Sequence, residues 1–224
     1  MAPVTEIAIA QLRPGMSPIP RTKLLQGKPG LTASREAPQI EKPRIWAMFT
    51  DWDDVSSLRL FQQQTGEYDA YIDALSRQCA KPAELAVYHV ALDPPLSSPV
   101  APEASGKGLL EAAPVVEVVR LYFPADLSEV AQQDVLAQVD KSKKEFFLPN
   151  AKGRVGEPAF GFALEPAVFQ GEKVRVLFAL AGWESAEVWK AWAESEVAKT
   201  GIAKMKGLPG LKGQELFPVR CRLN

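Results

Sequence analysis

The chain has 224 residues, of which 46% are hydrophobic and 24% charged, and its formal net charge is −1. These values are ordinary for a globular protein with its own hydrophobic core, and a nearly neutral chain without a run of lysine or arginine is not expected to bind nucleic acid or an anionic membrane. No apolar run approaches the roughly 18 residues of a membrane span, and the start of the chain lacks the pattern of a signal peptide, so we expect a cytoplasmic protein.

The first part of the chain alternates strand and helix patterns. A run rich in β-branched residues begins at Val4 and ends at the turn signal Arg13-Pro14-Gly15. Asp51 and Asp53 supply N-cap chemistry for a helix after the third strand. The predicted elements are a strand at 4–12, a short helix at 21–26, strands at 31–36 and 44–50, a helix from residue 55 that Gly66 interrupts, a helix at 68–78 and a strand at 84–92.

Proline, serine, alanine and glycine dominate residues 94–112. This composition is typical of a chain without regular structure. We therefore predict a mobile linker on the surface, between two similar domains.

The same order of patterns returns after the linker. A strand ends at Pro124, and Asp126 or Ser128 supplies the N-cap of a long helix. The predicted elements are a strand at 115–123, a helix at 127–147, strands at 157–164 and 174–181, a helix at 184–199 and a strand at 215–223.

Residues 41–53 and 172–184 share Glu, Lys, Arg and Trp at the same four positions, which indicates two copies of one unit. The opening strands also match, at residues 4–7 and 115–118. Each copy then has the order β-α-β-β-α-β, which is the ferredoxin-like unit. We predict a first repeat at 1–93, a linker at 94–112 and a second repeat at 113–224.

Four motifs carry a resemblance to a known family: the Val-Thr-Glu-Ile opening with its Pro-Gly stop, the corners Phe-Thr-Asp-Trp-Asp and Ala-Gly-Trp-Glu-Ser, and the closing Tyr88-His89-Val90. The chain resembles tandem antibiotic-biosynthesis-monooxygenase (ABM) proteins of filamentous fungi, in the dimeric α/β-barrel superfamily. The resemblance implies an α+β fold in which two ferredoxin-like sheets face each other as a barrel within one chain, with helices outside. It also implies a monomer with an internal pseudo-dimer, or a homodimer.

Strand alternation sorts the expected faces of the sheets. We assign the apolar series of the last strands, which includes Tyr88 and Val219, to the helix side, and this leaves His89 and Arg220 between the sheets. The polar residues expected between the sheets are Gln11, Arg44, His89, Arg120, Tyr122, Arg175 and Arg220.

These residues supply the candidate catalytic groups. His89 is the only histidine, and an imidazole titrates near neutral pH, so it is the candidate general base. Tyr122 would donate to a developing oxyanion, and Arg120 would hold an enolate or carboxylate. The candidate substrate-binding residues are Trp46, Met48, Gln11, Arg44, Arg175 and Arg220.

A structural interpretation stays open beside the catalytic one. His89 could be a hydrogen-bonded sheet histidine between the two copies, with the arginines paired to Glu6, Glu117 or Glu215. Cys79 and Cys221 have no metal-ligand spacing, and no nucleotide-binding motif occurs, so no metal or other cofactor is expected.

We therefore predict a cofactor-independent enzyme of fungal secondary metabolism that oxygenates, cyclises or rearranges an apolar polyketide- or terpenoid-like molecule. The alternative is a non-catalytic ABM-like binding or stress-response protein.

Overall fold

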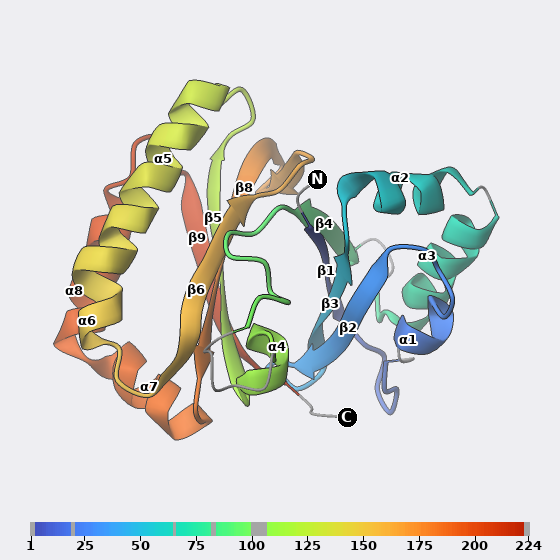
Figure 1. Ribbon diagram of the computed structural model, residues 1–224, viewed down its shortest axis with the longest axis horizontal. Helices are drawn as coiled ribbons and strands as arrows, with labels where there is room; N and C mark the ends of the chain where they lie inside the picture. The colour runs from blue at the N-terminus through green and yellow to red at the C-terminus, as the bar shows by residue number, and fades with distance from the viewer. Residues whose placement is uncertain (1–2, 19–20, 65, 82–83, 100–106, 222–224) are drawn as a thin grey trace.

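The computed structural model describes residues 3–18, 21–64, 66–81, 84–99 and 107–221. Figure 1 shows two β-sheets that face each other, with helices on their outer sides. The first sheet has four antiparallel strands in the order β2-β3-β1-β4, and the second has five, in the order β6-β8-β5-β9 with β7 paired to β8. The strands are β1 (Val4–Gln11), β2 (Leu31–Pro38), β3 (Ile45–Trp52), β4 (Ala86–Val90), β5 (Val115–Pro124), β6 (Arg154–Phe162), β7 (Ala167–Phe169), β8 (Glu172–Trp183) and β9 (Gly213–Arg220).

Each sheet carries helices from its own half of the chain (Figure 1). The first sheet is covered by α1 (Arg21–Leu24), α2 (Val55–Gln63) and α3 (Glu67–Gln78). The second is covered by α5 (Glu129–Ser142), the π-helical turn η2 (Lys143–Phe147), α6 (Leu148–Asn150), α7 (Ala186–Glu194) and α8 (Glu196–Lys206). In the part of the chain that the structure describes, no helix is long and apolar enough to cross a bilayer.

The duplicated strand-to-helix corner lies where the sequence predicts it. Trp52 ends β3 and Trp183 ends β8, and both side chains are 0% exposed. The helix that follows begins with an N-cap residue whose side chain accepts a hydrogen bond from a backbone N–H. This residue is Asp54 in the first copy, which accepts from Ser57, and Ser185 in the second, which accepts from Val188. The cap is Asp54 rather than Asp51 or Asp53, because β3 continues through Asp51 and Trp52.

The helix expected at 184–199 is in fact two helices. Ser195 has an extended backbone, and its side chain accepts a hydrogen bond from the backbone N of Ala198 at 3.1 Å. Ser195 therefore ends α7 and caps α8, since a serine at an N-cap satisfies a backbone donor that the helix leaves free. Ser128 caps α5 in the same way, as predicted.

The two sheets close into a barrel within the chain. At one edge Gln39, just after β2, bridges Val219 of β9, and at the other Val90 and Asp93 bridge Ala163 and Phe160. The interior is filled by hydrophobic side chains from both sheets, including Ile7, Phe49, Val118 and Phe178. The predicted α+β barrel of two ferredoxin-like repeats is confirmed, and closure leaves few strand edges open to other chains.

The segment between the repeats is packed, which corrects the prediction of a mobile surface linker. Leu96, Leu109 and Leu110 are at most 4% exposed and belong to the barrel core. The short helix α4 (Leu109–Ala112) lies against β6 and β8. A Cβ at Gly108 would lie 2.2 Å from the carbonyl oxygen of Leu96, so only glycine fits this close approach. Residues 100–106 of the predicted linker lie outside the described residues.

The predicted faces of the last strands are reversed. Tyr88, Val90, Phe217 and Val219 belong to the barrel core, so His89 and Arg220 point to the helix side. The error arises because helices cover the outer face of each sheet, and both faces of β4 therefore carry apolar residues. Met48 lies with the helices too, as does Trp46 two residues before it, while Ile45, Ala47 and Phe49 face the barrel.

We expect the chain to be monomeric, because it forms both halves of its own barrel. Sedimentation equilibrium across micromolar concentrations should give the mass of one chain. A mass of two chains that persists on dilution would contradict this expectation and would show that another surface pairs.

Candidate active site

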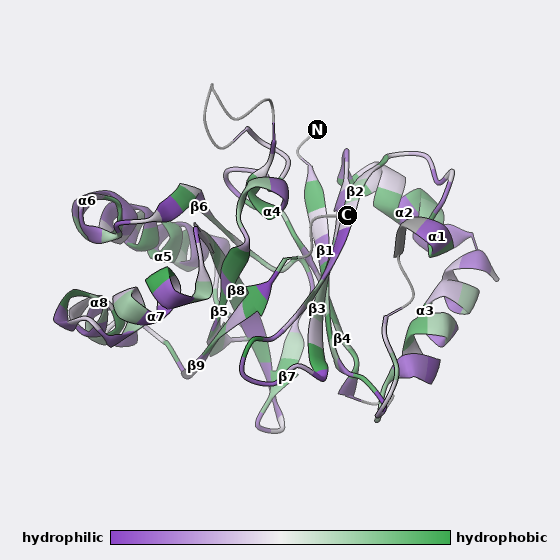
Figure 2. Ribbon diagram, turned by 90° about the horizontal axis from the view of Figure 1, so that it is seen from below, coloured by the Kyte–Doolittle hydropathy of each residue, from purple (hydrophilic) through white to green (hydrophobic). Residues whose placement is uncertain are grey.

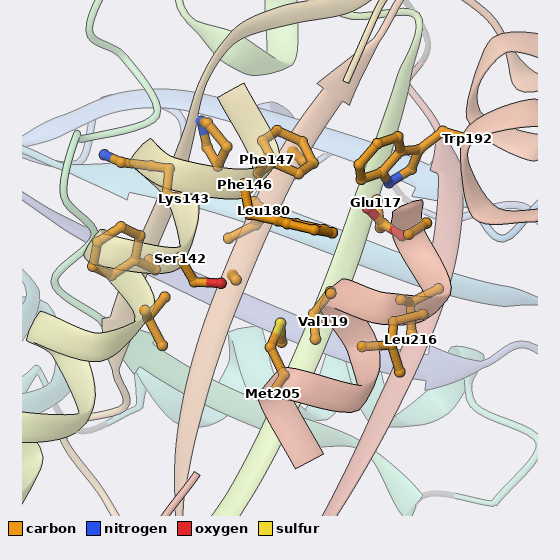
Figure 3. Close-up of a pocket in the computed structure, with 18 of the residues that line it drawn as sticks. Glu117, Val119, Ser142, Lys143, Phe146, Phe147, Leu180, Trp192, Met205 and Leu216 are labelled. Atoms are coloured by element: carbon orange, nitrogen blue, oxygen red, sulfur yellow. The ribbon is translucent and has the colours of Figure 1, made fainter. Parts of the chain in front are cut away.

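A hydrophobic pocket of about 180 Å³ lies between the second sheet and its helices. Strands β5, β6, β8 and β9 form one wall, and α5, η2, α7 and α8 form the other. Figure 3 shows Phe146, Phe147, Met205 and Leu216 around this space, with Glu117 beside Trp192 at one end and Lys143 at the opposite side. The lining is almost entirely apolar, as in sites that hold small organic molecules.

The sequence builds the sheet wall by strand alternation. Val119 and Glu117 are two residues apart on β5, so both point to the helix side of the sheet. The helix wall depends on the π-helical turn, in which the chain winds more widely at Lys143–Phe147. Lys143, Phe146 and Phe147 of this turn all line the pocket, and π-turns of this kind frequently occur at functional sites.

Glu117 is the buried acidic group of the pocket. Its residue is 6% exposed, and Trp189 Nε1 donates a hydrogen bond to Oε1 at 3.2 Å. Burial raises the pKa of its carboxyl to about 7, although the hydrogen bond from Trp189 lowers it. A carboxyl that titrates near pH 7 is suited to take and return a proton.

Gly201 of α8 leaves space for the ring of Phe146, which forms an aromatic wall of the pocket. A Cβ at this position would lie 2.6 Å from Cε1 of Phe146, so any side chain would force the ring to move. Lys204 Nζ lies 4.8 Å from the centre of the same ring, within the range of a cation–π contact. The position of Phe146, and with it the shape of the pocket, therefore depends on glycine at residue 201.

The first repeat has a buried glutamate at the equivalent place. Glu6 is 0% exposed, and its Oε1 accepts a hydrogen bond from Tyr71 Oη at 2.6 Å. His89 Nε2 lies 3.4 Å from Glu6 Oε2. The tyrosine and the histidine thus occupy the space around Glu6, whereas Glu117 faces a pocket.

The sequence contained a signal for both glutamates. Val4, Ala8 and Ala10 pack toward the helices, and Glu6 interrupts this apolar series in the same strand. Glu117 interrupts the series of Val115 and Val119 in the same way. A carboxylate inside an apolar series, repeated in both copies, indicates a buried acid rather than a solvated one.

His89 has a different environment from the one expected. Its Nδ1 lies 2.7 Å from Oε1 of Glu165, and Gln62 Nε2 lies 3.4 Å from its Nε2. Burial lowers the pKa of the imidazole, but hydrogen bonds to Glu165 and Glu6 and their negative charges outweigh burial and raise it to about 9. This arrangement agrees with the structural interpretation, in which His89 links the two repeats.

Arg120 and Tyr122 lie together, but His89 is not with them. Arg120 Nη2 is 2.5 Å from Glu215 Oε2, and Tyr122 Oη donates to the same oxygen at 2.6 Å. Burial and then Glu215 raise the pKa of Tyr122, although Arg120 lowers it. The three candidate catalytic residues therefore do not converge in one cavity, and the roles assigned to them stay predictions.

The candidate substrate-binding residues are spread over the molecule. None of them lines the hydrophobic pocket. Trp46 and Met48 are buried, Arg44 and Arg220 are exposed, Gln11 is half-buried, and Arg175 Nη1 donates to the carbonyl oxygen of Leu164 at 3.1 Å. Among the described residues, no group of three His, Cys, Asp or Glu side chains could hold a metal ion.

The closed barrel with outer helices is the dimeric α/β-barrel fold, and solved structures share it over nearly the whole chain. An anthrone oxidase-like protein matches 99% of this chain and 92% of its own, with a TM-score of 0.69 and 12% identity. A candidate monooxygenase from Fusobacterium nucleatum matches 98% and 92%, with a TM-score of 0.53 and 8% identity. One from Lactobacillus acidophilus NCFM matches 99% and 94%, with a TM-score of 0.52 and 8% identity. No protein-family model and no curated protein matches the sequence.

Proposed function

We propose that the chain is a cofactor-independent enzyme that removes a proton from an apolar aromatic substrate in the hydrophobic pocket of the second repeat. The observation that carries the proposal is Glu117, a buried carboxyl with a pKa of about 7 at the end of an almost entirely apolar pocket. The ionised carboxylate would accept the proton, and the apolar walls would hold the flat substrate against it.

The carbanion or phenolate formed in this way is electron-rich. It would react with dioxygen in an oxygenation or with another part of the same molecule in a cyclisation. The chain shares its fold with an anthrone oxidase-like protein and with candidate monooxygenases, and this similarity supports testing the oxygenation first. The resemblance to fungal tandem ABM proteins supports a place in secondary metabolism, where such substrates occur.

Anthrone is a suitable probe, because it is flat, uncharged and acidic at one carbon. We expect the wild-type protein to accelerate oxygen uptake and the formation of anthraquinone absorbance. In Gly201→Ala the new Cβ displaces Phe146, which lines the pocket. Because the displaced ring would shift the substrate away from Glu117, we expect turnover to fall about tenfold. The gain in helix propensity, roughly 1 kcal/mol for alanine over glycine, offsets the cost of moving the half-buried Phe146 ring, so the melting temperature should change little.

Thr200→Ala is the matched control. It lies next to Gly201 on α8, is exposed, and also gains helix propensity. It should keep wild-type turnover. Binding of anthrone without oxygen uptake would instead favour the non-catalytic ABM-like binding protein, and neither binding nor uptake would exclude this substrate class.

A further inference from the structure

A second hollow lies at one end of the barrel, away from the pocket that contains Glu117. Its volume is about 700 Å³, and β4, β5, β9 and the hairpin of β7 form its walls. Figure 2 shows β7 and its turn at this end of the two sheets, next to β4. Both repeats thus contribute to the hollow, and its lining shares no residue with the hydrophobic pocket.

The charges of this hollow are already paired. Arg120 forms an ion pair with Glu215, and Glu84 at the rim forms one with Lys81 at 2.8 Å. An ionic ligand would have to break one of these pairs or stay without a counter-charge. The paired charges therefore favour an uncharged ligand.

The hydrogen-bonding groups are not all used. Tyr88 Oη accepts a hydrogen bond from Arg120 Nη1 at 3.2 Å, which leaves its own hydroxyl proton to donate elsewhere. Arg120 Nε is buried and has no partner among the described residues. That nitrogen is enclosed by the protein, so the donor that remains for a ligand is the hydroxyl of Tyr88, which favours a ligand that supplies an acceptor such as a carbonyl oxygen.

Glu215 supplies the complementary group. Its Oε2 accepts from both Arg120 and Tyr122. A carboxylate has about four lone-pair sites, so it can accept a further hydrogen bond from a ligand hydroxyl. The aromatic ring of Tyr122 stacks on Phe169 at a centroid distance of 3.9 Å, which gives the hollow a flat aromatic wall.

We propose that this hollow, formed by Tyr88, Arg120, Tyr122 and Glu215, is a binding site for a flat, uncharged molecule that carries a carbonyl oxygen and a hydroxyl group. Tyr88, held by Arg120, donates to the carbonyl oxygen, and Glu215 accepts from the hydroxyl. The proposal does not depend on the function of Glu117.

Three coumarins test the chemistry of the site by isothermal titration calorimetry at pH 6, where a phenolic hydroxyl is protonated. 7-Hydroxycoumarin carries both groups, coumarin lacks the hydroxyl, and 7-hydroxycoumarin-3-carboxylate adds a negative charge. We expect 7-hydroxycoumarin to bind about fivefold to tenfold more tightly than either of the others, the difference made by one hydrogen bond or one unpaired charge.

Two substitutions locate the ligand. Tyr88→Phe removes the donor and keeps the ring, so 7-hydroxycoumarin should bind about fivefold more weakly. Glu215→Gln leaves Arg120 without its counter-ion, so the preference should reverse and the carboxylate should become the tightest ligand. Glu117→Gln should change none of these affinities, because Glu117 lines the other pocket.

The proposal is overturned if 7-hydroxycoumarin does not bind or binds no better than coumarin. It is also overturned if Tyr88→Phe and Glu215→Gln keep wild-type affinities, or if Glu117→Gln weakens binding. The last result would place the ligand in the hydrophobic pocket instead.

Discussion

Glu117→Gln should reduce turnover of anthrone at least about a hundredfold, the usual contribution of a positioned general base. Glutamine has nearly the same shape and can still accept the hydrogen bond from Trp189, so the pocket should remain intact. It cannot accept the substrate proton. Oxygen uptake under saturating anthrone is the measurement.

The pH dependence gives a second readout. The base acts only when ionised, so wild-type turnover should rise as pH increases through about 7 and then level off. The residual turnover of Glu117→Gln should lack this step. A wild-type rate that does not change across pH 7, or a variant that keeps its turnover, would contradict the assignment.

The stability of the wild-type protein should fall over the pH range in which its turnover rises. Burial raises the folded-state pKa of Glu117 from 4.5 to about 7, so the folded protein favours the neutral acid. The wild type therefore loses stability as pH rises from about 4.5 to 7, by roughly 3 kcal/mol. Glu117→Gln avoids this loss and should melt higher than the wild type at pH 8. Glu194→Gln, an exposed position on α7, should change neither turnover nor melting.

The fold was predictable because the chain contains two copies of one unit, whose sequences can be compared with each other. The matching corners at Trp52 and Trp183 establish the repeat, and both residues prove to be buried anchors of helix on sheet. The assignment of faces failed in β3, β4 and β9, because alternation distinguishes a buried face from a solvated one. Here both faces are buried, by the other sheet on one side and by helices on the other.

The site was less predictable than the fold. The interruption of an apolar series by Glu117 could be recognised from the sequence. The space in front of it could not, because it depends on the π-helical turn and on how Phe146 packs against Gly201. The uniqueness of His89 drew attention to a residue whose partner, Glu165, lies in the other repeat and 76 positions away.

The two repeats use the same buried acid in different ways. In the first, Tyr71 and His89 satisfy Glu6, and the surrounding aromatic rings pack closely, with Phe61 against Trp52 at 5.5 Å. In the second, Glu117 meets a pocket. Duplication allows the buried acid of one copy to become structural while that of the other copy faces a cavity. Substitution of His89 should therefore change the stability of the protein and not its catalysis.

His89→Ala should lower the free energy of unfolding by about 3 to 5 kcal/mol at pH 6, as expected when one partner of a buried charged pair is removed. The substitution leaves the Glu6 carboxyl, which is 0% exposed, without its imidazolium. It also removes the ion pair between the imidazole and Glu165 of the second repeat, and leaves only the hydrogen bond that the backbone N of residue 89 donates to Glu165. For a chain of this length the melting temperature should fall by roughly 6 to 20 °C.

The loss of stability in His89→Ala should depend on pH, and the direction of the pKa shift of His89 determines how. The folded-state pKa of His89 is raised from 6.5 to about 9, so its contribution is complete below pH 6.5, declines as pH rises, and is absent above about 9. Glu165 acts in the opposite range: its pKa is lowered, so its contribution is lost as pH falls through the usual range of a carboxyl. The difference in melting temperature between wild type and His89→Ala should therefore be large at pH 6 and small at pH 10.

Turnover separates this structural role from the catalytic one. At a temperature well below the melting transition, His89→Ala should turn over anthrone at the wild-type rate per folded molecule, because His89 does not line the pocket that contains Glu117. Glu165→Gln provides a milder comparison: it removes the charge, keeps a hydrogen-bond acceptor, and is half-exposed, so it should cost less than His89→Ala. A variant that melts like the wild type but has lost turnover would overturn the structural role and return His89 to the active site.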